Sequence, residues 1–183
     1  VRVQVLSSFN DEPGTLVVDE DEVVEQELIT GVAYNRNEAK ITIVDVPDRP
    51  GAVAAIFGPL ADANINVDMI VQNIAHDSGR TDVTFTVPRT ELVRSTDVLE
   101  QAKADIGFAR LLADDNVAKI SVVGVGMRSH AGVAQRMFRA LADRGINVLA
   151  ITTSEIKISV LIDAAYAELA VRALHSAYGL ETV

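Results

Sequence analysis

The sequence has no cysteine, no tryptophan and few aromatic residues of any kind. Aromatic residues make up 4% of its 183 residues. Without thiols, neither disulfides nor thiolate metal sites are available, and few rings are present on which nucleic-acid bases could stack. The chain also lacks a run of about 18 apolar residues, which a membrane-spanning helix needs, and a basic-then-apolar leader. We therefore expect a cytoplasmic protein without a membrane partner.

Positive charge is scarce as well. The chain has 16 Lys and Arg residues against 26 Asp and Glu, which gives a formal net charge of −10. Because nucleic-acid binding depends on cations that replace the counterions of the phosphates, we expect no nucleic-acid partner. An acidic cluster could hold a cation, but such runs are more often solvated linkers, and we interpret it as a linker. Its residues are Asp19, Glu20, Asp21, Glu22, Glu25 and Glu27.

What the sequence does contain is an internal repeat. Residues 60–70 recur as residues 141–151, with seven of the eleven positions identical. At the same offset Gly51 matches Gly132, and Asp48 matches Ser129; Asp and Ser are both residue types that cap helix N-termini. A repeat of this kind indicates a duplicated structural unit. The length of the chain allows two domains of about 90 residues each.

Each copy predicts a strand, a turn, a helix and a second strand. Apolar residues recur at helical spacing, and β-rich runs at 39–44 and 118–123 precede the turns. The helical stripes are Val53, Ile56, Phe57 and Leu60 in the first copy, and Ala134, Met137, Phe138 and Leu141 in the second. Along the whole chain we predict strands at 1–6, 15–18, 27–34, 40–46, 65–74, 81–87, 108–112, 119–125, 146–152 and 156–162, a turn at 35–38, and helices at 52–63, 89–104, 133–144 and 163–178.

These elements give an α+β fold of two ferredoxin-like βαββαβ units packed as a pair. After its last helix the second unit has no fourth strand of its own. We predict that residues 27–34 supply this strand, so that the first unit is inserted in the second. Gly179 is predicted to end the last helix.

The turn and the strand start of the first copy resemble the ACT domain, which binds small ligands. The tandem as a whole looks like the two ACT units of aspartokinase. The matching stretches are 48–51, 66–73 and 81–89 for the first unit, 127–133 and 153–162 for the second, and 3–9 with 13–15 for the end of a kinase domain. The resemblance implies that 1–22 are a residual strand and acidic linker from the kinase junction, 39–114 are ACT domain 1, and 23–38 plus 115–183 are ACT domain 2.

The resemblance also implies a function. It predicts the allosteric, amino-acid-sensing part of aspartokinase, which binds threonine and/or lysine at ACT–ACT interfaces for feedback inhibition of the first step of aspartate-family biosynthesis. The kinase domain with its Lys-Phe-Gly-Gly motif, which would use ATP and Mg, has no counterpart in this sequence. We therefore expect a chain that is not catalytic by itself and needs no cofactor. Its expected partners are a second copy of the chain, which makes a homodimer through the ACT domains, and/or a catalytic aspartokinase subunit.

The chemistry of the repeated turns suits a zwitterionic ligand. A helix N-terminus presents unpaired N–H groups and a partial positive charge, which favour a carboxylate, and Gly51 and Gly132 let a ligand approach the backbone. Asp48 could accept an ammonium group, and Asn66 and Gln72 can both donate and accept. As single residues Asp48 and Ser129 could simply be helix caps, so the constellation carries the prediction.

Carried over from the family, two sites are implied. One draws on Asp48, Pro50, Gly51, Val53, Asn66, Val67, Asp68 and Gln72. The other draws on His130, Gly132, Val133, Ala134, Asn147, Val148 and Ser154. The copies differ, since Leu149 stands opposite Asp68 and Thr153 opposite Gln72, so the sites need not bind the same ligand. Ala131 also stands where the family often has Pro.

Two alternatives remain open. The chain could be a structural oligomerisation module with empty ligand sites. It could also be a nucleotide-binding enzyme, because Gly124-Val125-Gly126 follows a strand and precedes a helix, although Ser129 stands where a dinucleotide fingerprint needs Gly and no P-loop is present. No catalytic residue is predicted, and His76, His130 and His175 do not have metal-ligand spacing.

Overall fold

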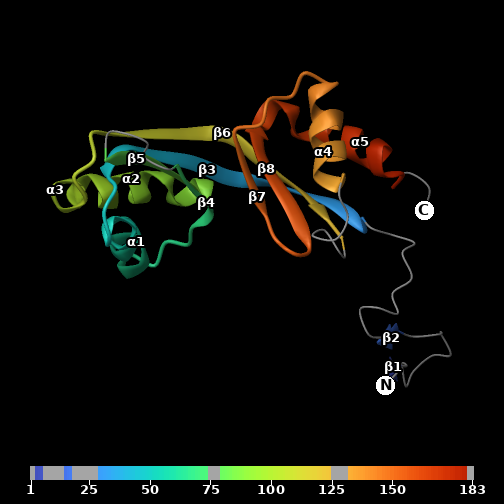
Figure 1. Cartoon of the computed structure of the whole chain (residues 1–183), viewed down its shortest axis with the longest axis horizontal. Helices are drawn as coiled ribbons and strands as arrows, with labels where there is room; N and C mark the ends of the chain where they lie inside the picture. The colour runs from blue at the N-terminus through green and yellow to red at the C-terminus, as the bar shows by residue number, and fades with distance from the viewer. Residues whose placement is uncertain (1–2, 6–14, 18–28, 74–78, 125–131, 181–183) are drawn as a thin grey trace.

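The computed structural model describes residues 3–5, 15–17, 29–73, 79–124 and 132–180. Six strands in these ranges form one antiparallel sheet in the order β4-β5-β3-β6-β8-β7, and helices cover it (Figure 1). The strands of this sheet are β3 (Gly31–Pro47), β4 (Asp68–Gln72), β5 (Arg80–Val87), β6 (Arg110–Val123), β7 (Ala150–Thr153) and β8 (Lys157–Asp163). A separate antiparallel pair consists of β1 (Val3–Val5) and β2 (Thr15–Val17).

The helices fall into two groups, one at each end of the sheet (Figure 1). The first group is α1 (Ala52–Asp62), the short 3₁₀ helix η2 (Arg89–Glu91), α2 (Leu92–Gln101) and α3 (Lys103–Ile106). The second is α4 (Val133–Ala142), η3 (Ala164–Tyr166) and α5 (Ala167–Tyr178). We call the half with α1–α3, β4 and β5 the first unit, and the half with α4, α5, β7 and β8 the second unit. The α+β class and the pair of ferredoxin-like units are confirmed.

The strand order is the same when read from either edge. Exchanging β4 with β7, β5 with β8 and β3 with β6 leaves it unchanged, so the sequence repeat is also a structural repeat. A hydroxyl pair occurs in each copy: Thr42 with Thr84 at 2.9 Å and Ser121 with Ser159 at 2.8 Å. The two units are therefore related by an approximate twofold axis that passes between β3 and β6.

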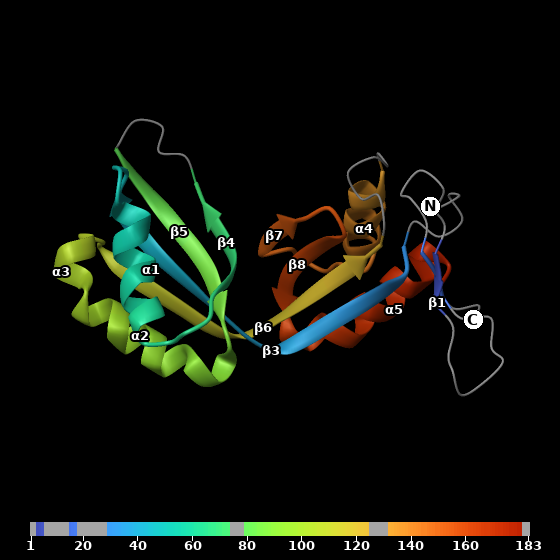
Figure 2. The same ribbon diagram turned by 90° about the horizontal axis from the view of Figure 1, so that it is seen from below.

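The two central strands are shared by both units. The first part of β3, 31–35, pairs with 119–123 of β6, and its later part pairs with β5. β6 in turn pairs through 110–114 with β3 and through 117–123 with β8. Each long strand thus runs from one unit into the other (Figure 2). The pairing of 31–35 with the second unit is the one that the predicted insertion requires; the domain division itself stays a prediction.

Two features of the predicted strand pattern are wrong. Residues 35–38 do not form a turn, because β3 continues through them with register shifts at Asn35, Glu38 and Lys40. The strands predicted at 108–112 and 119–125 are likewise one strand. The reason is a tertiary contact: Glu38 is only 4% exposed and its side chain pairs with Lys119. A polar stretch that looks like a turn therefore passes through the centre of the sheet.

Each unit has its own apolar core between sheet and helices. In the first unit the core includes Ile41, Phe85 and Leu60, and in the second it includes Ile120 and Leu141. Leu60 and Leu141 are repeat-equivalent and almost fully buried, at 1% and 0% exposure. The repeated phrase therefore reflects the same core position used twice.

The helices depart from the prediction in detail. Val53 is exposed, so it does not belong to the buried stripe, which consists of Ala52, Ile56 and Leu60. The helix predicted at 89–104 is divided into η2, α2 and α3. Gly179 ends α5 in the left-handed region, as predicted. No helix in the described ranges is long and apolar enough to span a membrane.

Candidate functional site

Both repeat helices begin at a glycine in the left-handed region. Gly51 has φ 91° and Gly132 has φ 105°, and within the described residues no side chain caps either α1 or α4. The alternative that Asp48 is simply the cap of α1 is therefore excluded, while Ser129 lies outside the described residues. Because a Cβ is strained at such φ values, glycine suits these positions. In α1 the Ala52 N–H donates to the Arg49 carbonyl at 3.1 Å. The N–H groups that follow it in the first turn keep their partial positive charge for another acceptor.

The turn before α1 places polar groups around this open helix start. Asp48, Pro50, Gly51 and Val53 are all exposed, and the Asp48 N–H donates to the Gly79 carbonyl at 2.9 Å. That bond ties the turn to the sheet while the Asp48 carboxylate stays in solvent. The arrangement can present an acceptor beside a helix N-terminus, which is what a zwitterion requires.

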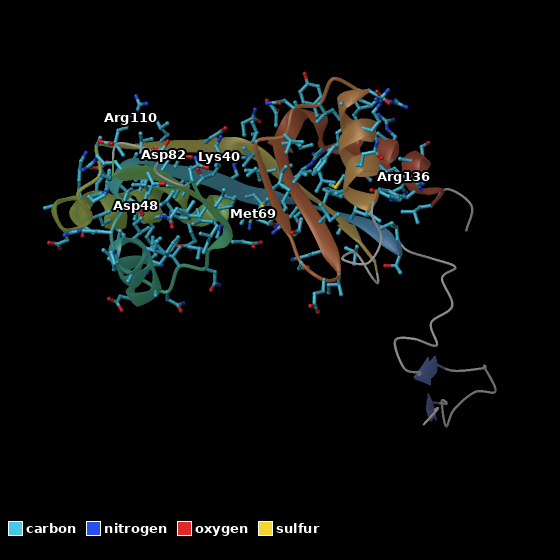
Figure 3. The ribbon with its side chains drawn as sticks, viewed as in Figure 1. Lys40, Asp48, Met69, Asp82, Arg110 and Arg136 are labelled. Atoms are coloured by element: carbon cyan, nitrogen blue, oxygen red, sulfur yellow. The ribbon has the colours of Figure 1, made fainter. Side chains whose placement is uncertain are left out.

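The other predicted residues of the first site lie elsewhere. Asn66 and Val67 precede β4, after α1 has run its length of about 16 Å, and Asp68 begins the strand. Gln72, at the other end of β4, pairs with Val83 of β5. The structure thus divides the set: the turn and Gln72 lie at the outer end of the first unit, and residues 66–68 lie beside the second unit. Figure 3 shows Asp48 and Met69 at these two ends.

The second copy is arranged in the same way. Gly132 and Ala134 begin α4, with Val133 buried between them, and Asn147 and Val148 follow the helix before β7. Ser154 forms a tight turn in which its N–H donates to the Lys157 carbonyl at 2.8 Å. The predicted residue His130 lies outside the described residues. In neither copy does one unit bring its helix start and its strand start together.

A charged cluster that the sequence did not reveal lies where the units meet. Lys119 Nζ of β6 is 2.7 Å from Glu38 Oε1 and 2.6 Å from Asp68 Oδ2. Asn35 Nδ2 also donates to Glu38 Oε1 at 2.9 Å. The three charged residues are far apart in sequence, so only the pairing of β3 with β6 could have revealed them. In the sequence, the one feature that pointed to this cluster was the unusually polar stretch within β3.

The ion pairs of this cluster shift the pKa values of two of its members. Burial by itself would raise the pKa of Asp68, but the hydrogen bond from Lys119 and that from the Met69 N–H outweigh it, so the pKa is lowered. Burial alone would lower the pKa of Lys119, but its hydrogen bonds to Asp68 and Glu38 raise it. Both residues are therefore held in their charged forms.

A small pocket of roughly 150 Å³ opens beside this cluster. Three of the predicted ligand residues, Asn66, Val67 and Asp68, line it together with buried Glu38. The hydroxyl of Thr86, which is 1% exposed, has no hydrogen-bond partner in the described part of the chain and also belongs to the lining. The pocket can accept a small polar group. No cluster of His, Cys, Asp and Glu that could hold a metal is found among the described residues.

Both the sequence and the fold are similar to those of known proteins. Two models of the ACT domain match the chain, one over residues 40–106 and one over residues 120–178. An aspartokinase of Pseudomonas aeruginosa is 55% identical in an alignment that covers 99% of this chain and 44% of that protein. The chain thus spans less than half of the length of this curated relative.

Solved structures of the same kind share the fold. The regulatory subunit of aspartate kinase from Thermus thermophilus, in its ligand-free form, is 41% identical with a TM-score of 0.79, over 83% of this chain and 99% of that chain. Aspartokinase III of E. coli, in complex with lysine and aspartate, is 25% identical with a TM-score of 0.69, over 97% of this chain and 39% of that chain.

Proposed function

The chain belongs to the aspartokinase family, in which it corresponds to the regulatory region with two ACT domains, and from this premise we propose that it binds free threonine and/or lysine. The amino acid binds at ACT–ACT interfaces and provides feedback inhibition of an attached or partnered aspartate kinase. The observation that carries this proposal is the pair of uncapped, glycine-led helix starts, each in an exposed turn.

The division of each predicted set supports a site between units. Within one unit, α1 separates the helix start from Asn66 and Val67 by its whole length. A ligand can touch both kinds of element only when the turn of one unit faces the strand start of another unit, from this chain or from a second copy. The α-carboxylate lies at the helix start, and Asp48 and Gln72 accept and orient the ammonium group.

Inhibition follows from differential affinity. An amino acid that ties a turn to a strand start favours one arrangement of units over others. A kinase domain that is active in a different arrangement is then inhibited, and by linkage its substrates weaken effector binding in return. Lysine bound to the related E. coli enzyme supports an amino acid as the ligand class.

Isothermal titration calorimetry of the 183-residue chain with L-threonine and L-lysine tests this function. We expect saturable binding of at least one, and we expect Asp48→Ala or Gln72→Ala to abolish threonine binding. Asp97→Ala, which removes an exposed carboxylate of α2 that belongs to neither predicted site, is the control and keeps the affinity. Unchanged affinity in both site variants would refute the site.

One observation favours the alternative of a purely structural assembly module. The two edge strands β4 and β7 expose Ile70 and Ile151 at 49% and 44%, which is suited to pairing with another copy. A ligand that binds only the folded state raises its melting temperature. If millimolar lysine and threonine leave the melting temperature unchanged, the assembly function is favoured instead.

A further inference from the structure

Strand β4 has an irregularity at its first two residues. Asp68 pairs with Thr86 and Val71 with Thr84, so the register shifts between them. Met69, inside the shift, has φ 48°. Long side chains rarely adopt this left-handed region, and bulges of this kind re-aim a side chain. The Asp68 carboxylate stabilises the bend, because its Oδ1 accepts the Met69 N–H at 2.8 Å.

The bend directs Met69 into the second unit. Met69 is 3% exposed and packs with Val117 and Leu161, both fully buried, and with Ala150. Ala150 is the repeat-equivalent of Met69, so the two copies of one position meet near the twofold axis. Figure 3 shows Met69 on the side of the first unit that faces β7 and β8.

Lys119 makes the polar counterpart of this contact. It stands in register with Asn35 on one side and with Leu161 on the other, and Leu161 is in register with Ala150. One row across the sheet of the second unit therefore carries both contacts: Leu161 and Ala150 receive Met69, and Lys119 receives Asp68. Lys119 is itself held by buried Glu38 at 2.7 Å.

We propose that Lys119 is a positioning residue for the effector site of the first unit. It fixes Asp68, which holds the bend at Met69 on one side and sets the path of Asn66 and Val67 on the other. Asn66 carries the polar side chain offered to the effector. This inference rests on the proposed function and adds to it. The second unit sets the affinity of a site whose strand start belongs to the first unit, and effector binding in turn strengthens the docking of the two units.

The repeat supplies an internal comparison. The residue that matches Lys119 in the first copy is Lys40, whose one ion pair in the described residues is with Asp114 at 3.8 Å. Leu149 replaces Asp68 in the second copy, so that copy offers Lys40 no carboxylate at the equivalent position. The coupling is therefore built into only one of the two strand starts, and Lys40 is a matched control.

Calorimetric titration with L-threonine and L-lysine tests the inference on the 183-residue chain. Lys119→Met removes the charge and keeps the length of the side chain, and it is expected to weaken the affinity about tenfold, within the usual range of coupling between sites. Lys119→Arg keeps the charge and restores most of the affinity. Lys40→Met leaves the affinity as in the unaltered chain.

Hydrogen exchange of the Met69 amide is a second measurement of the same coupling. We expect this exchange to slow on effector binding in the unaltered chain, and not in Lys119→Met.

Three outcomes overturn the inference: equal affinity in Lys119→Met and the unaltered chain, an equal loss in Lys40→Met, or no rescue by arginine. Lys119→Met leaves the charge of Glu38 buried without its cation and could for that reason fail to fold. The double variant Glu38→Gln with Lys119→Met then removes this charge, and its affinity is compared with that of the unaltered chain by the same criteria. If the unaltered chain itself binds neither amino acid, the proposed function fails rather than this inference alone.

Discussion

Gly51 matters because of its conformation rather than its size. A Cβ placed on Gly51 would meet no atom within 4 Å, yet φ is 91°. The backbone conformation, and not the space around it, therefore requires glycine at this helix start. By contrast, Gly58 lies inside α1, has equally open space around the position of a Cβ, and has no left-handed φ.

We expect opposite effects from the same substitution at these two glycines. Gly51→Ala destabilises by about 1–2 kcal/mol because of the left-handed backbone. Gly58→Ala stabilises by about 0.5–1 kcal/mol because alanine costs less backbone entropy in a helix. Urea unfolding monitored by circular dichroism measures both. A loss of stability in both variants would contradict this account of Gly51.

The Lys119 ion pairs predict a pH dependence of stability. The lowered pKa of Asp68 means that its contribution is present above pH about 4 and is lost as the pH falls below that value. The raised pKa of Lys119 means that its contribution is present below pH about 10 and is lost at higher pH. The difference in melting temperature between the unaltered chain and Lys119→Met is thus largest near neutral pH. A difference that stays constant from acid to strongly alkaline solution would contradict this.

At the scale of elements, α5 is tied to the start of α4 by one hydrogen bond. The Tyr178 hydroxyl donates to the Val133 carbonyl at 2.7 Å. Burial raises the pKa of Tyr178 to about 12, although the Arg136 cation opposes this. A raised phenol pKa means that the contribution of the neutral hydroxyl is complete below pH about 10 and is lost between about 10 and 12.

Tyr178→Phe is expected to cost about 1 kcal/mol, because the hydrogen bond from its hydroxyl to the Val133 carbonyl is lost. The exposed Tyr166, at 43% exposure, provides the control, and Tyr166→Phe should change stability by less than about 0.5 kcal/mol. Absorbance titration should show that Tyr178→Phe removes the tyrosine that ionises near pH about 12. If Tyr178→Phe instead removed a tyrosine that ionises at a lower pH, the result would contradict a buried Tyr178 hydroxyl.

The elements also show what a sequence can predict. The helices α1 and α4 follow from apolar spacing, and β5 from strict alternation, because these patterns are local. The continuity of β3 through Glu38 is not local, because it depends on Lys119 of a distant strand. The sequence allowed two interpretations of Asp48, as a helix cap or as a group that faces a ligand, and the structure was needed to show that no side chain caps α1 and that the Asp48 N–H donates to the Gly79 carbonyl. The candidate ligand residues were found through the repeat, whereas their division between two ends of the unit required the structure.

At the scale of the whole molecule, β3 and β6 join the units into one sheet. Neither unit can lose its sheet without disrupting strands of the other. We therefore expect a single cooperative unfolding transition in calorimetry. Two separate transitions would contradict the shared strands.

Matched core truncations sharpen this prediction. Leu60→Ala in the first unit and Leu141→Ala in the second each remove a buried leucine at the same repeat position. Each is expected to cost about 3 kcal/mol and to shift the whole transition to lower temperature. A variant in which half of the transition keeps its original midpoint would show that the units unfold independently.

The central claim is that an amino acid joins the helix start of one unit to the strand start of another. A crystal structure grown with L-threonine and L-lysine tests it most directly. We predict density for an amino acid whose carboxylate meets the first N–H groups of α1 at Gly51, with the residues around Asn66 or Asn147 of a facing unit on its other side. Helix starts that stay empty at millimolar concentrations of both amino acids would contradict the claim.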